Sequence, residues 1–453
     1  MFIATNPTTG EELKSYPLHD AAQVEEALKA SRETYASWKS TSFSERADLL
    51  NRVAQVMEDD IESLAEWMTL EMGKPVGEAH GEVKKSILCA RHYAEKAEEY
   101  LAPVSIESDA HHSYVQHLPV GSILGILPWN APFWLAYRFC APAIMAGNVC
   151  LMKHDPHVPG CAEAIADCFI KAGAPAGLMQ NLRLSTEQIA DVIKDDTVQG
   201  VSLTGSSGAG SQVAALAGKE IKPVVLELGG SDPSLILVDA DLNRASEVLT
   251  LSRIINAGQS CIAAKRIIVE APVYEAFIER FQARLAELVV GDPADETSNV
   301  GPIARDELRQ AMHRQVTQTV EQGGRCLMGG EIPEGKGYFY PVTLLVDVEP
   351  GMVAACEETF GPIAVVMKAE SEAHALELAN DTPYGLAASI WTADRAKAEQ
   401  MSVKIEAGQV AINGIVKTDP RLPSGGIKRS GLGRELGPQG IHEFVNAQQV
   451  WVG

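Results

Sequence analysis

The sequence contains no long apolar run and no excess of positive charge. No stretch approaches the ~18 uninterrupted apolar residues of a membrane-spanning helix, and residues 1–7 lack a basic segment followed by an apolar core. The 38 basic residues stand against 60 acidic ones, a formal net charge of −22. This balance disfavours a broad surface for nucleic acid or anionic membranes. We therefore expect a cytoplasmic protein with no nucleic-acid partner and no membrane partner.

The cysteines lack the spacing of a disulfide framework or a metal site. They stand apart, without Cys-x-x-Cys pairs, at positions 89, 140, 150, 161, 168, 261, 326 and 356. Such scattered cysteines are typical of reduced thiols, most of them small buried side chains. His154 and His157 have the spacing of a metal-binding pair, but no set of acidic or cysteine partners accompanies them. We expect no metal.

The pattern of apolar residues indicates an α/β protein. A chain of 453 residues with 46% hydrophobic residues can bury a large core and form about two to four domains. In the first hundred residues, Asp20–Gln23 and Ser42–Glu45 resemble capping boxes that begin helices. After Gly121, short apolar runs alternate with helix-length segments, which is typical of βα repeats and a parallel sheet. The expected strands are 123–127, 149–152, 201–203, 224–228, 235–238, 266–270, 362–367 and 387–391. The later ones predict a second α/β domain after about residue 231.

Two short motifs point to thiol chemistry on a carbonyl group. Cys261 ends the run Gly258-Gln-Ser-Cys, and Glu227 begins Glu-Leu-Gly-Gly at the end of an apolar strand. A thiolate is a nucleophile, and a carboxylate at the rim of a sheet can serve as a base. For either residue alone, a buried inert thiol or a structural salt bridge is at least as common. The joint pattern favours an enzyme.

A glycine-rich segment follows one of the expected strands. Residues 203–210 run through Gly205 and Ser206 into an expected helix, where free backbone N–H groups and the helix dipole favour an anion. The segment departs from the Gly-x-Gly-x-x-Gly dinucleotide pattern, and a plain turn is an equally good interpretation of it in isolation. It is a candidate phosphate-binding loop.

With these motifs in order, the chain resembles the NAD(P)-dependent aldehyde dehydrogenase family over nearly its whole length. The matching segments are Asn6–Gly10, Glu71–Pro75, Pro128–Asn130, Lys153, Gly205–Gly210, Glu227–Gly230, Gly258–Cys261, Glu357–Pro362 and Ser424–Glu435. Within the family, Lys153-His154, Gly230–Pro233, Cys261–Arg266 and Lys417–Pro423 most resemble a short bacterial group of succinate-semialdehyde dehydrogenases.

The resemblance implies an aldehyde dehydrogenase-like architecture. A Rossmann-type cofactor domain is expected over 1–111 and 121–230, and an α/β catalytic domain over 231–425. A small β oligomerisation flap is expected over 112–120 and 436–453. Such flaps usually join subunits, and the apolar segment 448–452 would be an exposed strand edge in a monomer. We expect a homodimer or homotetramer.

The resemblance also implies a mechanism with three catalytic residues, Cys261, Glu227 and Asn130. The Cys261 thiolate would attack the aldehyde to form a thiohemiacetal. The side-chain amide of Asn130 and the backbone N–H of Cys261 would donate hydrogen bonds to the developing oxyanion. Glu227 would act as the base and would later activate the water that hydrolyses the thioester.

The cofactor is expected to be NAD or NADP. The positions that the resemblance assigns to it are Leu127, Pro128, Trp129, Lys153, Gly205, Ser206, Glu358 and Phe360. Lys153 would meet the adenosine ribose, but the glutamate that many NAD-using relatives carry three positions later is Pro156 here. Asp155 would disfavour a 2′-phosphate, whereas protonated His154 or His157 would favour it. The preference between the two cofactors stays open.

Arg138 and Trp134 are the substrate-binding residues that the resemblance implies. Arg138 lies eight positions after Asn130, where relatives that oxidise semialdehydes have an arginine for the substrate carboxylate. A guanidinium offers a bidentate fork to a carboxylate. An ordinary ion pair is the structural alternative. The expected reaction is oxidation of succinic semialdehyde to succinate.

Two departures from the family pattern bear on this substrate. Ile255 replaces a second arginine of some relatives, and Ser424 replaces a common phenylalanine. Lys417 or Arg421 would then supply the missing charge. Oxidation of another short or aromatic aldehyde is the first alternative. A CoA-acylating dehydrogenase, which the retention of Glu227 disfavours, and a non-catalytic structural or binding homologue are the others.

Overall fold

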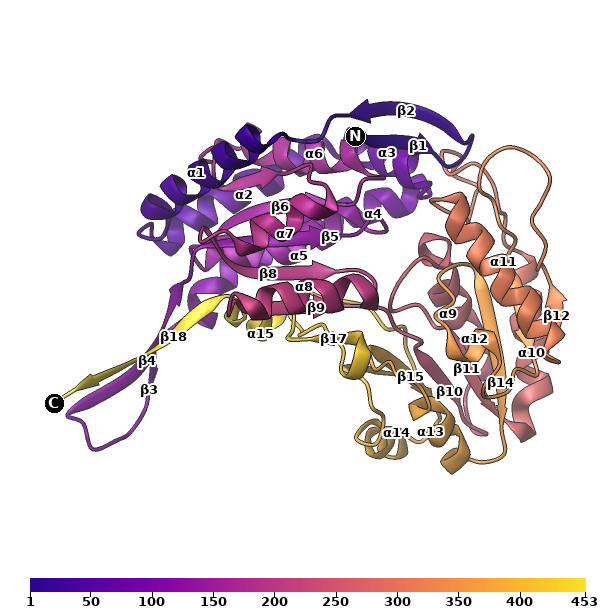
Figure 1. Cartoon of the computed structure of the whole chain (residues 1–453). Helices are drawn as coiled ribbons and strands as arrows, with labels where there is room; N and C mark the ends of the chain where they lie inside the picture. The colour runs from indigo at the N-terminus through magenta and orange to yellow at the C-terminus, as the bar shows by residue number, and fades with distance from the viewer.

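The computed structural model describes all 453 residues as two α/β lobes from which a three-stranded arm projects (Figure 1). Each lobe has its own hydrophobic core. One core contains 50 buried residues from the N-terminal helices and the first large sheet, and another contains 45 buried residues around the second large sheet. Separate cores of this size define two domains.

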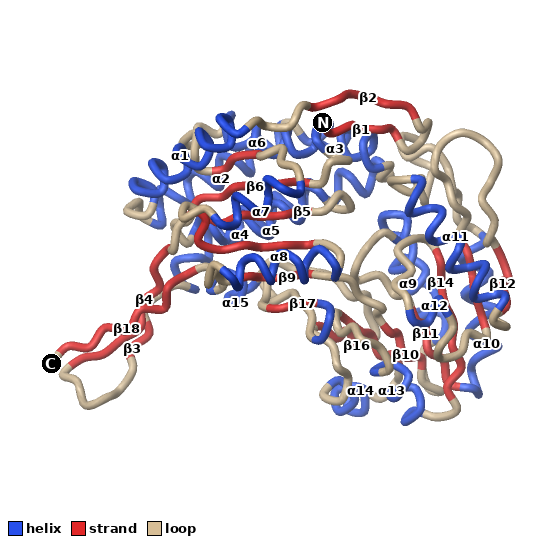
Figure 2. The backbone as a smooth tube through the Cα atoms, viewed as in Figure 1, coloured by secondary structure: helices blue, strands red, loops and turns tan.

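The first lobe is built on a six-stranded sheet. Its strand order is β17-β9-β8-β5-β6-β7, with every neighbouring pair parallel except β17 and β9. The strands are β5 (Ser122–Leu127), β6 (Val149–His154), β7 (Met179–Asn181), β8 (Val198–Thr204), β9 (Val224–Glu227) and β17 (Gly431–Leu432). Helices cover both faces of the sheet, so its strands are apolar runs rather than alternating ones (Figure 2).

The N-terminal helices begin where the capping boxes predict. Asp20 caps α1 (Ala21–Trp38) and Ser42 caps α2 (Phe43–Asp59), each with both reciprocal hydrogen bonds of the box. The other helices of this lobe are α3 (Ile61–Met72), α4 (Val76–Tyr100), α5 (Pro132–Met145), α6 (Pro159–Lys171), α7 (Thr186–Lys194), α8 (Ser207–Lys219) and α15 (Gly437–His442). The hairpin of β1 (Phe2–Asn6) and β2 (Glu11–Tyr16) packs on α3 and α6.

The second lobe is built on a seven-stranded sheet with the order β12-β13-β14-β11-β10-β15-β16. Only β12 is antiparallel to its neighbour. The strands are β10 (Pro233–Ile236), β11 (Arg266–Glu270), β12 (Arg325–Met328), β13 (Thr343–Val346), β14 (Ile363–Ala369), β15 (Ala387–Trp391) and β16 (Gln409–Ile412). The helices are α9 (Leu242–Ile254), α10 (Tyr274–Ala286), α11 (Asp306–Glu321), α12 (Val353–Cys356), α13 (Glu372–Asn380) and α14 (Arg395–Ser402).

All eight strands expected from the sequence occur in the two large sheets. The largest difference between an expected and an observed strand end is three residues, at the start of β8.

The arm differs from the expected flap in its boundaries. It pairs β18 (Val445–Val452) with β4 (His112–Pro119) and β4 with β3 (Val104–Ser105), so it has a third strand within the range expected for the cofactor domain. Conversely, α15 lies within the range expected for the flap but packs on α4 and α5. A two-residue strand such as β3 carries too little alternation to be recognised in a sequence.

The topology of the first sheet places a crevice at its centre. From β5 the chain crosses to β6 on one side, whereas β8 lies on the other side, so the strand order reverses between β5 and β8. Ligands bind in open α/β sheets outside the carboxyl ends of the strands at such a switch point. Here those ends lead into residues 128–130 and 205–206. No helix of the protein is both long and apolar enough to cross a membrane.

Candidate active site

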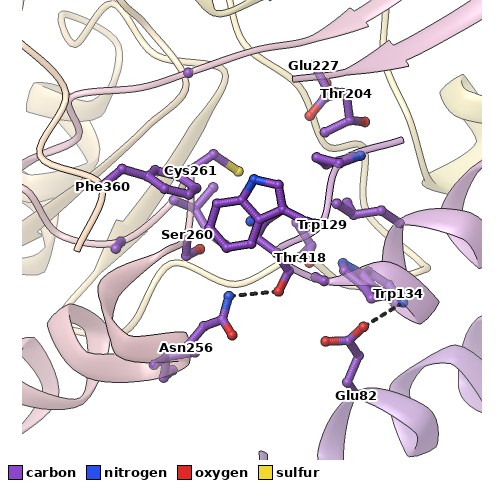
Figure 3. A pocket seen from close by; sticks show the side chains of 18 of the residues that line it. Glu82, Trp129, Trp134, Thr204, Glu227, Asn256, Ser260, Cys261, Phe360 and Thr418 are labelled. Atoms are coloured by element: carbon purple, nitrogen blue, oxygen red, sulfur yellow. Dashed lines mark hydrogen bonds between the residues drawn. The ribbon is translucent and has the colours of Figure 1, made fainter. Parts of the chain in front are cut away.

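A cavity of about 650 Å³ opens between the two lobes at this switch point. The first lobe contributes the ends of β5, β8 and β9 together with faces of α4 and α5, and the second contributes α9, the Cys261 loop and residues 415–418. Cys261, Glu227 and Asn130 all line it. Figure 3 shows the Cys261 sulfur directed into the cavity and the Glu227 carboxylate on another wall. The structure thus brings the three expected catalytic residues to one space.

The loop before Cys261 has an unusual backbone. A short 3₁₀ turn (Ile255–Gly258) holds Asn256, Ala257 and Gly258 at φ values of 60°, 52° and 73°, in the left-handed region. A Cβ on Gly258 would lie 2.2 Å from the Gly361 carbonyl oxygen, so only glycine fits there. The buried side chain of Arg253 fixes both ends of the loop, because its guanidinium donates to the carbonyls of Gly258 (2.7 Å) and of Ala264 (3.0 Å). Such backbone strain is typical of functional loops.

The thiol of Cys261 is protonated in the resting site. Burial raises its pKa to about 11, while the positive charges of Lys265 and Arg138 oppose that rise. Lys265 is fully buried, and its ammonium group donates to the carbonyls of Ser260 (2.9 Å) and Cys261 (2.5 Å). The thiolate therefore needs a base or a bound ligand that favours it.

Glu227 has the properties of that base. It is the last residue of β9 and is only 4% exposed, and burial raises its pKa to about 7 against the opposing charge of Arg138. One carboxylate oxygen, Oε2, accepts a hydrogen bond from Arg138 Nη2 at 3.0 Å, and Oε1 has no partner in the protein. A carboxylate with a raised pKa and one free oxygen can take up a proton near neutral pH.

Arg138 is already committed to two carboxylates. Its Nε donates to Glu435 Oε2 at 2.6 Å, and its Nη2 contacts both Glu435 and Glu227. Its Nε and Nη2 groups are therefore occupied by protein carboxylates, and the bidentate grip on a substrate carboxylate stays a prediction that would require these ion pairs to rearrange. Arg138 still lines the cavity with Nη1 free of protein partners, but its main contact positions Glu227.

Asn130 is fixed against the Cys261 loop. Its side-chain Nδ2 donates to the Gln259 carbonyl at 3.0 Å, which leaves its second N–H for a ligand. Its own carbonyl accepts from Asn256 Nδ2 (2.7 Å) and from the Lys74 ammonium (3.0 Å). The amide of Asn130 is thus held against Gln259, two residues before Cys261, so it lies next to the thiol loop, where an oxyanion donor is needed.

A buried ion pair supports this arrangement from α4. Lys74 pairs with Glu82, and Glu82 Oε1 accepts from the backbone N–H groups of Phe133 (2.9 Å) and Trp134 (3.2 Å) at the start of α5. Figure 3 shows the Glu82 carboxylate directed at Trp134. A carboxylate satisfies the free N–H groups of a helix N-terminus and the helix dipole. Lys74 lies in the motif Glu71–Pro75, Gln259 in Gly258–Cys261 and Glu435 in Ser424–Glu435, but the sequence assigned no role to any of them. Glu82 and Asn256 were not assigned a role either.

The crevice at β8 fits a dinucleotide phosphate. Gly205 follows β8, and the Ser206 hydroxyl caps α8 by accepting from Ala209 N at 3.2 Å. Both residues line the cavity, at the N-terminus of a 13-residue helix. The free N–H groups there can donate to an anion.

Glu358 lines the same cavity as the phosphate-binding crevice and the Cys261 thiol. Its Oε1 accepts from Gly230 N at 3.1 Å and lies 3.2 Å from the Lys265 ammonium. A Cβ on Gly229 would lie 2.3 Å from Glu358 Oε2, so a side chain at position 229 would displace the Glu358 carboxylate from this position. Of the other expected cofactor residues, Pro128, Trp129 and Phe360 line the cavity, and Leu127 is buried at the end of β5.

Lys153 lies near the end of β6, outside the lining of the cavity. Beyond it, Asp155 accepts a hydrogen bond from His157 Nδ1 at 2.7 Å. His154 is buried against the Pro132 carbonyl, and burial lowers its pKa to about 4, so it is neutral at physiological pH. His154 therefore offers no positive charge to a 2′-phosphate. No group of three His, Cys, Asp or Glu side chains is arranged to hold a metal ion.

Trp134 and two lysines form the remaining wall of the cavity. Lys85 and Lys417 both line it, as does Thr418. Arg421 does not, because its guanidinium is turned to Asp419, with hydrogen bonds of 2.8 Å and 2.6 Å. Of the two charges considered for a substrate, only Lys417 faces the site.

A switch-point crevice that meets a buried thiol, a carboxylate base and an amide donor defines a two-domain, dinucleotide-dependent enzyme of thiol chemistry. Comparison with known proteins gives its family. Residues 2–450 match the aldehyde dehydrogenase family, and the chain belongs to it.

The similar proteins share the full length of the chain. A Synechocystis protein named probable succinate-semialdehyde dehydrogenase (NADP+) is 46% identical over 453 residues, with 100% of both chains covered. An Escherichia coli succinate semialdehyde dehydrogenase (NAD(P)+) is 43% identical over 449 residues, 99% of this chain and 97% of the other. The crystal structure of succinic semialdehyde dehydrogenase from Streptococcus pyogenes in complex with NADP+ is 34% identical, with a TM-score of 0.98 and 100% of both chains covered.

Proposed function

We propose that this protein oxidises succinic semialdehyde to succinate with NAD or NADP. The observation that carries the chemistry is the convergence of Cys261, Glu227 and Asn130 on one cavity between the lobes. The observation that supports a substrate with a carboxylate is the pair of lysines, Lys85 and Lys417, on the same cavity. The names of the full-length relatives agree with this substrate.

The proposed reaction begins with proton transfer from the Cys261 thiol toward Glu227, directly or through one water molecule. The thiolate attacks the aldehyde carbon, and the free N–H of Asn130 donates to the resulting oxyanion. A nicotinamide held in the crevice would supply the hydride acceptor that converts this adduct to a thioester on Cys261. Glu227 releases the thiol proton to solvent and then removes a proton from water, whose oxygen attacks the thioester carbon. The C–S bond breaks, and the proton on Glu227 passes to the departing thiolate, which leaves the acid and the free thiol.

The residues of the crevice fit the cofactor that this reaction needs. The N-terminus of α8 at Gly205 and Ser206 would hold the pyrophosphate, and Glu358 would hold the nicotinamide ribose. We propose that NADP is accepted as well as NAD, since position 156 is a proline and carries no glutamate to repel a 2′-phosphate. Relatives named for NADP agree with this proposal.

The test compares reduced-cofactor formation from succinic semialdehyde and from butanal, with NAD and with NADP. Butanal matches the chain length and lacks the carboxylate. A strong preference for the semialdehyde supports the proposal, and equal turnover of butanal would leave only the dehydrogenase chemistry. Product analysis with and without CoA separates hydrolysis from acyl transfer, because only a CoA-acylating enzyme would form the acyl-CoA.

We further infer that the protein is a cytoplasmic homodimer or homotetramer. All eight cysteines are free, which suits a reducing compartment. The arm carries exposed apolar side chains on an open sheet edge, which suits a subunit contact.

A further inference from the structure

The amino group of Lys85 is an unpaired positive charge on the wall of the active-site cavity. Lys85 belongs to α4, lines the cavity and makes no ion pair with any carboxylate. Its Nζ donates to the Thr418 hydroxyl at 2.7 Å and lies 4.1 Å from the centroid of the Trp134 ring. Thr418 and Trp134 line the cavity too. The ammonium group therefore has one protein hydrogen bond and two N–H groups to spare.

Such a charge is costly unless an anion compensates for it. Burial and the nearby positive charge of Arg138 lower the pKa of Lys85 to about 8, against the opposing charges of Glu82, Cys89 and Asp419. These carboxylates are engaged elsewhere, Glu82 with Lys74 and Asp419 with Arg421. The cavity thus retains a cation whose counter-charge has to come from a ligand.

Arg138 is a poorer partner for the same anion. Two glutamates already surround its guanidinium, and a substrate carboxylate would be the third negative group around one positive charge. Like charges this close repel strongly in a buried site. Lys85 has no such competitor.

We propose that Lys85 binds the distal carboxylate of the aldehyde substrate, with the Thr418 hydroxyl as a second donor. The hydroxyl oxygen accepts from Lys85, so its O–H is free to donate to the carboxylate. The Trp134 ring holds the ammonium group over its face by a cation–π contact. This assignment rests on the proposed semialdehyde oxidation and makes Lys85 its specificity-determining residue, with Arg138 positioning Glu227.

The test is the ratio of kcat/KM for succinic semialdehyde to kcat/KM for butanal in Lys85→Met. Loss of a charge-assisted hydrogen bond lowers the semialdehyde value by about 10- to 100-fold and leaves the butanal value within about threefold. Lys84→Met is the matched control, because Lys84 is the exposed neighbour on the same helix and lies outside the lining. Thr418→Val should lower the ratio by a smaller factor, about three- to tenfold.

A second readout is the pH dependence of the same ratio in the unmodified protein. The ratio cancels the titrations of Cys261 and Glu227, which both substrates share. Since Lys85 loses its proton as the pH rises through about 8, the ratio should fall above that pH, and it should be flat and low in Lys85→Met. This readout does not depend on the folding of a variant.

The outcomes separate the two proposals. A wild-type protein without preference for the semialdehyde would refute the proposed function itself. A wild-type preference that persists in Lys85→Met and is flat across pH 8 would refute the role of Lys85 and leave the proposed function intact.

Discussion

Glu227 should set the acid limb of the pH profile. Its pKa, raised to about 7 by burial, means that the base is protonated and inactive below that pH, so kcat/KM should fall as the pH drops through about 7. Glu227→Gln should remove this limb and lower kcat by about 10²- to 10⁴-fold, with a thioester adduct on Cys261 visible by mass spectrometry.

Glu78 provides the matched control for this prediction. It lines the same cavity, and burial also raises its pKa to about 7, but its carboxylate accepts from the Asn256 backbone N–H at 2.7 Å. Glu78→Gln should therefore keep the acid limb whatever it does to the rate. A limb that persists in Glu227→Gln and disappears in Glu78→Gln would reverse the assignment of the base.

Lys265 should control the reactivity of the thiol. It is the largest influence that lowers the Cys261 pKa, and it also pairs with Glu358 at 3.2 Å. Lys265→Met should shift the midpoint of Cys261 alkylation to higher pH by about one unit, or about tenfold in rate at a fixed pH, and should raise KM for the cofactor through Glu358. Peptide mapping after iodoacetamide treatment measures the alkylation of Cys261 separately from that of Cys356, which is exposed.

The control for Lys265 is an exposed lysine of the same lobe. Lys368→Met on β14 removes a charge that lies over the Tyr274 ring, away from the cavity. It should leave both the alkylation midpoint and the cofactor KM unchanged. An unshifted midpoint in Lys265→Met would show that this lysine supports only the loop.

At the scale of elements, the Glu82 cap joins α4 to the start of α5 and so to Asn130. Glu82→Gln removes the negative charge from buried Lys74, and breaking a buried pair costs about 3–5 kcal/mol. We expect a free energy of unfolding in urea lower by about that amount, together with reduced kcat, because Lys74 also holds the Asn130 carbonyl. Glu98→Gln, an exposed change on the same helix, should be neutral. Equal stability of the two variants would contradict a structural role for the cap.

What the sequence could predict at this scale depends on the range of the interactions. The capping boxes at Asp20 and Ser42 are local, and they located the starts of α1 and α2 to the residue. Buried parallel strands are continuous apolar runs, and they were found with small errors at their ends. Element type and order therefore followed from short windows of sequence.

Ion pairs between residues far apart in the chain could not be predicted from such short windows of sequence. The partner of Arg138 is Glu435, 297 residues away, and neither residue carries a local sign of the pairing. Arg138 was thus assigned to a substrate from its place after Asn130, whereas the fold gives its charge to two glutamates. Lys85, in contrast, lies in an ordinary amphipathic helix, and only the tertiary structure shows that it faces the cavity.

At the scale of the whole molecule, the site exists only because two lobes meet. The first lobe supplies the base and the anion-binding helix, and the second supplies the thiol. After the last strand of the second lobe, the chain returns to the first lobe through β17, which pairs with β9 at Glu227. This C-terminal segment therefore connects the two lobes next to the base. A change of lobe spacing would therefore separate Cys261 from Glu227.

The arm should make the protein an oligomer. Its strand β18 is an unpaired edge, and Trp451 and Val452 at the end of this strand are 53% and 43% exposed. Val104 and Leu118 are exposed elsewhere on the arm. An apolar edge of this kind is a liability in a monomer and a contact surface in a closed assembly. Sedimentation velocity at micromolar concentration should show a dimer or tetramer.

The double change Trp451→Glu and Val452→Glu tests whether this edge is the contact. Two added charges in an apolar interface are costly without partners, so the variant should sediment as a monomer. The control is Val403→Glu with Ile221→Glu, which adds the same charge at two apolar residues that are 86% and 92% exposed on the body of the molecule. It should keep the wild-type oligomeric state. A wild-type protein that sediments only as a monomer would contradict the assembly, and an oligomer that survives the double change on the arm would place the contact elsewhere.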